Sequence, residues 1–187
     1  LAQGSPWPAV DQRHRLEPAR EAELRQPEEA GGDAVALQYS QNPYPRWRTL
    51  PPGRPPAATR QVLADLFPGT AIPLWDIPQV LVAGCGTGQH ALLAARQYSD
   101  ARVWAIDVSE ASLGYARRQA ERLGFPQVRF LRADLLDLGG ADLPPLFDLI
   151  ECVGVLHHLA DPAAGLAALG SRLGRGGWLR LGFYSRI

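Results

Sequence analysis

The sequence has no methionine, only two cysteines and no excess of either charge among its 187 residues. Lysines and arginines together number 19, as do aspartates and glutamates, so the formal net charge is zero. This balance argues against a broad basic surface for nucleic acid, because phosphate neutralisation drives most such binding. The two cysteines, Cys85 and Cys152, are too few for a disulfide framework, and each lies in an apolar, strand-like run. We expect both to be small buried side chains in a reducing, cytoplasmic compartment.

Long apolar runs are also missing. No stretch reaches the roughly 20 apolar residues that a membrane helix needs, so we expect no membrane association. The first ten residues, LAQGSPWPAV, lack the basic region and the apolar run of a signal peptide. Because not even an initiator methionine is present, we expect the chain to be a piece of a longer protein or a processed product.

Proline divides the chain into two parts of different character. Thirteen of the 17 prolines lie at or before Pro78. Residues 1–35 combine Pro, Glu, Arg, Gln and Gly with little apolar periodicity, which predicts a linker or a disordered arm. Residues 36–78 are expected to form an N-terminal cap segment with one helix over residues 56–67, where Val62, Leu63, Leu66 and Phe67 share a face. Residues 79–187 are expected to form the core domain.

From residue 79 onward, strand patterns alternate with helix patterns. Apolar and β-branched runs predict strands at residues 80–83, 102–106, 128–131, 147–153 and 178–183. Helices are predicted from about residue 89 to 98, from the Ser109 cap to Gly124, and from the Asp161 cap to Gly174. Such alternation is typical of an α/β, Rossmann-like, doubly wound parallel sheet, for which we expect the strand order 3-2-1-4-5. In these sheets, ligands bind outside the carboxyl ends of the strands.

A glycine-rich sequence, GCGTG at residues 84–88, connects the first strand to the following helix. Glycine allows a sharp turn and a close approach of the backbone to a ligand. A dinucleotide fingerprint would need a third glycine where Gln89 stands, and the GK[ST] of a P-loop is also absent. The pattern favours a cofactor with an adenosine but no pyrophosphate; a tight strand-to-helix turn without a ligand is the alternative. The residues expected to contact the cofactor here are Ala83, Gly84, Cys85, Gly86 and Gly88.

Two acidic residues follow the second and third strands. Asp107 ends the second strand, where a carboxylate can accept both ribose hydroxyls, with Val108 beside it. Its alternative role is that of a helix N-terminal acid, stabilised by the helix dipole. In Ala133-Asp134-Leu135, the acid can accept a hydrogen bond from an adenine amino group while the leucine packs on the ring. A solvated loop carboxylate is the alternative for Asp134.

A histidine pair follows the fourth strand, in ECVGVLHHL at residues 151–159. Glu151, His157 and His158 are the candidates for proton transfer, and Cys152 and Val153 are expected to lie beside the cofactor. The alternative is that one histidine packs against the sheet and the other faces solvent. No third ligand at the usual spacing accompanies the pair, so no metal site is expected.

Together, these motifs resemble a known family. VLVAGCGTG, WAIDVS, RADLLDL and FDLIECVGVLHHLADP occur in the order found in class I methyltransferases that use S-adenosylmethionine. The resemblance covers about residues 79–185. It implies S-adenosylmethionine as the cofactor and methyl transfer to a small-molecule or protein acceptor. A catalytically silent S-adenosylmethionine-binding domain is one alternative, and an NAD-binding oxidoreductase, disfavoured by Gln89, is another.

A closer resemblance is carried by NPYPRW, AGCGTGQ, GVLHHLADP and LGFYS, which look like methyltransferase domains attached to tetratricopeptide-repeat proteins in bacteria. No 34-residue period is present, so the chain would be fused to or cut from such a protein. The sheet of class I methyltransferases usually has seven strands, whereas this chain stops at Ile187, after the fifth. We therefore expect the core to lack the closing hairpin, with the fifth strand at an edge.

An aromatic segment precedes the core. Pro43 and Pro45 fix residues 42–47 as extended chain, and linkers seldom expose large aromatic side chains to solvent. We expect Tyr39, Tyr44 or Trp47 to pack against the cofactor cleft and to help shape the acceptor pocket. A proline-stiffened surface arm is the alternative.

Overall fold

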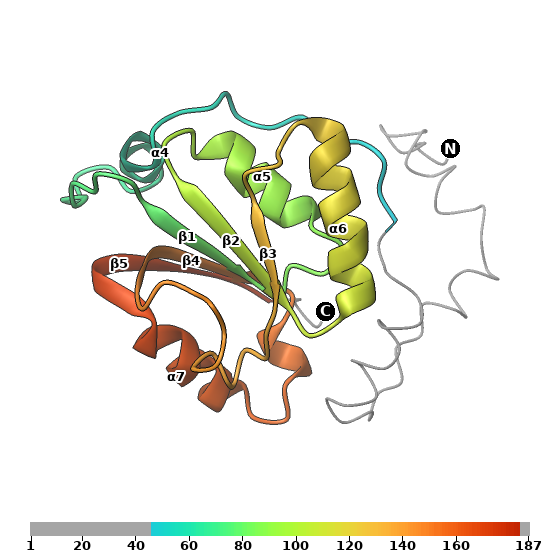
Figure 1. The fold of residues 1–187 in the computed structure, drawn as a ribbon. Helices are drawn as coiled ribbons and strands as arrows, with labels where there is room; N and C mark the ends of the chain where they lie inside the picture. The colour runs from blue at the N-terminus through green and yellow to red at the C-terminus, as the bar shows by residue number, and fades with distance from the viewer. Residues whose placement is uncertain (1–45, 184–187) are drawn as a thin grey trace, which may run out of the picture. The chain divides into compact units, whose positions relative to one another are not determined.

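A computed structural model describes residues 46–183 of the chain. The predicted arm at residues 1–35 and the side chains of Tyr39 and Tyr44 lie outside the described residues. The described part is built around a five-stranded parallel sheet with the strand order β3-β2-β1-β4-β5 (Figure 1). This order confirms the predicted fold class. Within the described residues, β1 lies at the centre of the sheet and β5 at an edge.

The strands of the sheet run over Gln79–Ala83 (β1), Arg102–Asp107 (β2), Arg129–Arg132 (β3), Phe147–Val153 (β4) and Leu173–Gly182 (β5). The helices run over Thr59–Leu66 (α4), Gln89–Gln97 (α5), Glu110–Leu123 (α6) and Pro162–Ser171 (α7), with a short 3-10 helix, η1, at Leu156–His158. Helices therefore alternate with strands from residue 79 onward, as the sequence pattern predicts, except that β3 is followed by β4 with no helix between them.

Side chains of the sheet alternate between two hydrophobic cores, one on each face. Val80 and Val82 of β1 belong to the core that α5 and α6 cover, whereas Leu81 and Ala83 belong to the core on the α7 side. Figure 1 shows α5 and α6 on one side of the sheet and α7 on the other. Because both faces of the sheet are covered, a central parallel strand is apolar on both sides, and this explains the continuous apolar run at residues 80–83 of β1.

The helix boundaries follow capping residues in the sequence. The Ser109 side chain accepts a hydrogen bond from the backbone N–H three residues further on, and Gly124 ends α6 in the left-handed conformation (φ 81°). Asp161 Oδ1 accepts from the backbone N–H groups of Ala163 and Ala164 at 2.9 and 3.0 Å. These contacts satisfy donors that have no partner within the helix. Both predicted N-caps are confirmed.

The end of α7 and the start of β5 differ from the prediction. The sequence predicts a helix up to Gly174, whereas α7 ends at Ser171 and Leu173 already pairs with Phe147 as the first residue of β5. The register then shifts along β4, which accommodates extra residues in β5. A Cβ atom at Gly177 would lie 2.9 Å from the Gly174 carbonyl oxygen, so the irregular pairing needs glycine there. Pairing with a strand 26 residues away overrides the turn signal of the local glycines.

The segment before the sheet contributes the helix α4. It begins at Thr59, three residues later than predicted, where the Thr59 N–H and hydroxyl both donate to Asp100 Oδ1, at 2.8 and 2.7 Å. Val62 of α4 joins the core on the α5 side. Phe67, directly after α4, packs on Trp178 of β5 with ring centroids 4.5 Å apart. These contacts hold α4 on the same face of the sheet as α5.

Candidate cofactor-binding site

The glycine loop, residues 84–88, leaves β1 and enters α5. Gly84, Gly86 and Gly88 have φ angles of 69°, 52° and 85°, a region that other residues adopt only with strain. A Cβ atom on Gly84 would overlap Val155, and one on Gly88 would lie 2.5 Å from the Ala116 Cβ. The loop therefore needs glycine for its own conformation and packing, and the assignment of a ligand depends on the polar groups around it.

Asp107 connects the glycine loop to the end of β2. Its Oδ2 accepts a hydrogen bond from the Gly86 N–H at 2.8 Å, and its Oδ1 accepts from the Ser109 N–H at 2.9 Å. Burial raises the pKa of this carboxyl, while the backbone N–H groups of Ser109, Gly86 and Val108 oppose the rise. Each oxygen has a second lone pair that these two bonds do not use, so the carboxylate keeps the capacity to accept a ribose diol. The ribose role fits this geometry and stays a prediction.

Asp134 occupies a more open position beyond β3. Its side chain is exposed, and Oδ1 accepts from the Leu136 N–H at 2.9 Å. The Ala133 N–H donates to the Asp107 carbonyl oxygen at 3.1 Å, which places this segment beside the end of β2. Leu135 is only 6% exposed and belongs to the core on the α7 side, so its burial is explained without the adenine ring expected against it.

Of the remaining residues expected beside the cofactor, the two cysteines are buried in the core and the two valines are exposed. Cys85 and Cys152 are buried, as predicted. Burial raises the pKa of Cys152 to about 11 and that of Cys85 well above its ordinary value, so both stay neutral thiols. Val108 and Val153, each 41% exposed, lie at the carboxyl ends of β2 and β4. This is the edge at which a doubly wound sheet binds ligands.

The two histidines lie in η1, with ring centroids 4.1 Å apart. His157 is exposed and His158 is half-buried. Burial lowers the pKa of His158, and the neighbouring His157 lowers it further, so the neutral ring is favoured. This burial pattern matches the alternative in which one ring packs and the other faces solvent, and a role in proton transfer stays a prediction.

Glu151 lies in a buried hydrogen-bonded cluster, which we call the Glu151 cluster. The side chain is 1% exposed, Oε1 accepts from the Tyr98 hydroxyl at 2.8 Å and from Arg180 Nη1 at 3.1 Å, and Oε2 lies 2.7 Å from His90 Nε2. Burial alone would raise the pKa of Glu151, but the bond to and charge of His90, with Tyr98 and Arg180, hold it below its ordinary value. A carboxylate enclosed by three partners is a poor candidate for the proton transfer predicted for Glu151.

No sequence pattern identifies the partners of Glu151. His90, Tyr98 and Arg180 are separated from it by 61, 53 and 29 positions along the chain. Only the parallel packing of β4 between β1 and β5, with α5 above, brings them together. The one sequence feature that could have indicated these partners is the acidic residue in the apolar run around residues 149–153, since such a charge needs partners when it is buried.

Trp47 packs against the glycine loop. It is 7% exposed, and its Nε1 donates to the Thr87 carbonyl oxygen at 3.1 Å. The Tyr115 ring of α6 meets it edge-on, with centroids 6.3 Å apart at 73°, and the Tyr115 hydroxyl donates to the Trp47 carbonyl oxygen. Trp47 belongs to the core on the α5 side, so it supports the loop from that face. Of the three expected aromatics, Trp47 is the one within the described residues, and it contacts the loop. Its role at an acceptor pocket stays a prediction.

Metal and membrane features can be described only for residues 46–183. Within that range, no group of three or more His, Cys, Asp or Glu side chains is placed to hold a metal ion. None of the helices in the same range is long and apolar enough to cross a membrane. The expectation of a metal-free site stays a prediction.

Residues 80–177 match the family described as a methyltransferase domain. The chain belongs to this family. The match includes the glycine loop, Asp107, Asp134 and the histidine pair, so this methyltransferase domain carries its expected cofactor residues inside the family's boundaries. Trp47 and Arg180 lie outside the matched region.

Relatives of the methyltransferase domain are longer than this chain. An uncharacterized protein of Synechococcus is 38% identical over 158 residues, covering 82% of this chain and 37% of that protein. A ubiquinone biosynthesis O-methyltransferase of Paracidovorax citrulli is 33% identical over 109 residues, covering 58% of this chain and 43% of that enzyme. The structure of PKMT2 from Rickettsia typhi in complex with AdoHcy gives a TM-score of 0.53 at 25% identity, covering 63% of this chain and 22% of that chain. The chain thus spans less than half the length of these relatives.

Proposed function

We propose that this domain binds S-adenosylmethionine and directs its methyl group to a small-molecule or protein acceptor. The observation that carries the proposal is the glycine loop held by Asp107 at the carboxyl edge of the sheet. The left-handed glycines bring bare backbone to the edge, and the buried carboxylate can accept ribose hydroxyls. The AdoHcy in the structure of PKMT2 supports this choice of cofactor.

The residues at this edge suit an adenosine cofactor without a pyrophosphate. Gln89 stands where a dinucleotide-binding loop has its third glycine. S-adenosylmethionine supplies a methyl group on a positively charged sulfur, which makes that carbon electrophilic. We assign Asp107 to the ribose and Asp134 to the adenine amino group. The exposed Val108 and Val153 would provide apolar contacts at the ends of β2 and β4.

Positioning is the main contribution that we assign to the protein. Holding an acceptor in line with the methyl group can be worth roughly 7–11 kcal/mol through proximity and orientation alone. A strong general base is therefore not required for the proposal. Among the three candidates for proton transfer, Glu151 is enclosed by its partners, which leaves His157 and His158 as the residues to substitute first.

The acceptor and the protein context are proposed as classes. One relative is named as an O-methyltransferase, which supports an oxygen atom as the acceptor. The motifs NPYPRW, GVLHHLADP and LGFYS support attachment to a tetratricopeptide-repeat protein. The length of the Synechococcus relative, of which the chain covers 37%, is compatible with such an attachment.

Calorimetry with S-adenosylhomocysteine and with NAD tests the cofactor. We expect saturable binding of the former only, and binding of NAD alone would overturn the proposal. Turnover is best tested on the longer protein, because the chain spans less than half of its relatives. A longer protein that binds S-adenosylhomocysteine but methylates neither protein extracts nor small hydroxylated molecules would favour the catalytically silent alternative.

A further inference from the structure

A second polar site lies on the α5 side of the sheet. A cavity of about 210 Å³ is bounded by the segment that precedes α4, by α5, and by β4 and β5. Its walls include Arg54 from the segment, Arg96 from α5 and Arg180 from β5, and we call it the arginine pocket. None of the residues expected to hold the cofactor lines this cavity.

The charge of the arginine pocket is unbalanced. Among the described residues of the lining, Glu151 is the only acidic one, so three arginines share one carboxylate. Both oxygens of Glu151 are already engaged, Oε1 by Tyr98 and Arg180 and Oε2 by His90. The carboxylate therefore has little capacity left to neutralise the other two arginines of the lining.

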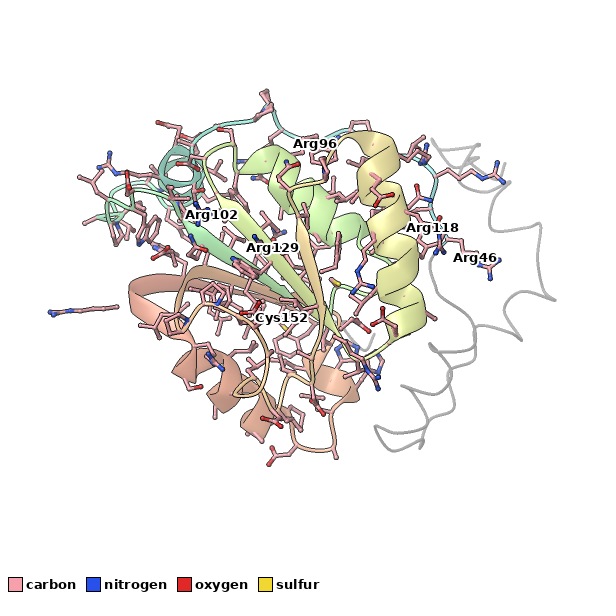
Figure 2. All side chains as sticks on the ribbon, in the orientation of Figure 1. Arg46, Arg96, Arg102, Arg118, Arg129 and Cys152 are labelled. Carbon is pink, nitrogen blue, oxygen red and sulfur yellow. The ribbon has the colours of Figure 1, made fainter. Side chains whose placement is uncertain are left out.

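Two of the arginines keep donors available. Arg96 Nη2 donates to the Pro51 carbonyl oxygen at 2.8 Å, which fixes the guanidinium against the segment but uses one of its five N–H groups. Gly53 permits this approach, because a Cβ atom there would overlap Arg96 Nη2. Arg54 makes no hydrogen bond or ion pair with any residue between 46 and 183. Figure 2 labels Arg96 on α5, beneath the segment that leads to α4.

Apart from His90, which pairs with Glu151, the rest of the described lining is apolar or uncharged. Leu93 and Ala94 of α5 form one wall, and Pro51 and Pro52 form another. Sites for drug-sized ligands usually measure about 300–1,000 Å³, so this cavity suits a smaller molecule. Guanidinium groups match carboxylates in charge and in planar, two-point geometry. The arginines come from three separate elements, which favours a ligand with more than one anionic group.

We propose that the arginine pocket binds a small organic acid with two or three carboxylates, at a site separate from the cofactor edge. The test is calorimetric titration of the full 187-residue chain with citrate, at constant ionic strength so that general screening does not change. Acetate, with one carboxylate, is the matched weaker ligand. We expect saturable binding of citrate and at least tenfold weaker binding of acetate.

Substitutions locate the site. Arg54→Gln removes a side chain that has no described partner, so folding is unaffected, and citrate binding should weaken about tenfold or more, as expected for one charge-assisted contact. Arg102→Gln, at the start of β2 and outside the pocket, is the control and should change nothing (Figure 2). Equal losses in both variants, or no saturable citrate binding to the parent chain, would overturn the proposal. Because S-adenosylhomocysteine affinity should be the same in all three proteins, failure here leaves the cofactor assignment standing.

Discussion

Replacing Glu151 with glutamine tests whether the buried carboxylate organises its part of the fold. The substitution keeps the size of the side chain but removes its charge and replaces one acceptor oxygen with an amide donor. Three donors now converge on the carboxylate, from Tyr98, Arg180 and His90, at 2.8, 3.1 and 2.7 Å. Glutamine keeps an acceptor oxygen for Tyr98 and Arg180, and its amide N–H groups can pair with His90 only when Nε2 carries no proton. The charge that holds Arg180 and a protonated His90 is therefore lost.

The expected loss of stability can be bounded from the structure. Hydrogen bonds to a charged group contribute about 1.5–3 kcal/mol each, and removing one partner of a buried ion pair costs about 3–5 kcal/mol. Arg180 and His90 are 58% and 29% exposed and can be rehydrated, which places the loss near the low end, at about 3 kcal/mol. For a chain of this length, that corresponds to a decrease in Tm of roughly 6–12 °C.

The matched control is Glu110→Gln. Glu110 pairs with Arg117 at 2.5 Å on the surface, where the two side chains are 58% and 41% exposed. Exposed pairs of this kind contribute about 0–1 kcal/mol. Thermal and urea unfolding of the parent chain and both variants, followed by circular dichroism, gives the comparison. Equal losses in the two variants would refute the organising role of Glu151.

The pH dependence of the stability difference between the parent chain and Glu151→Gln provides an independent check. The folded-state pKa of Glu151 is lowered, so its charge stabilises the fold fully above the pKa of an unfolded glutamate, about 4.3. As pH falls from there through the lower folded pKa, that contribution is lost. The stability advantage of the parent chain over Glu151→Gln should therefore shrink in acid, and an advantage that stays constant down to pH 2 would contradict the argument.

Three further predictions concern the cofactor edge and the thiols. Asp107→Ala should weaken S-adenosylhomocysteine binding in calorimetry about ten- to a hundredfold, because a charged acceptor for the ribose is lost, whereas Asp134→Ala should weaken it less; an unchanged affinity in the first variant would contradict the assignment. Trp47→Phe removes the hydrogen bond to the Thr87 carbonyl oxygen, so it should lower the free energy of unfolding by about 1 kcal/mol and weaken the binding of S-adenosylhomocysteine. Full affinity in this variant would limit Trp47 to a structural role. Cys152, whose pKa is raised to about 11, should react with a thiol reagent at pH 8 only after unfolding in urea; fast reaction of the folded chain would show that it is accessible.

Asp107→Ala and Trp47→Phe together distinguish a direct role in ligand binding from structural support of the glycine loop. Asp107 contacts the glycine loop directly through the Gly86 N–H, whereas Trp47 reaches it from the α5 side through the Thr87 carbonyl. If both variants lose cofactor affinity in proportion to their loss of stability, the loop acts as a single structural unit. If Asp107→Ala loses affinity at unchanged stability, the carboxylate acts on the ligand itself.

Local sequence was sufficient to predict most of the fold. The Ser109 and Asp161 caps and the glycine after α6 mark helix ends, because the groups they satisfy lie within a few residues of them. The apolar run of β1 predicts a strand covered on both faces, and alternation of strands with helices leads to a parallel sheet. The glycine loop and Asp107 could be placed together because successive strands of such a sheet end at the same edge.

The tertiary structure alone decided which side chains meet across long stretches of chain. The Glu151 cluster and the contact of Trp47 with Thr87 join residues 29 to 61 positions apart, and no periodic pattern links them. The early start of β5 likewise depends on pairing with β4, which overrides the turn signal of its glycines. Periodicity and capping report on a residue's immediate neighbours, whereas partners of a buried charge and the register of an edge strand are fixed only when distant elements pack.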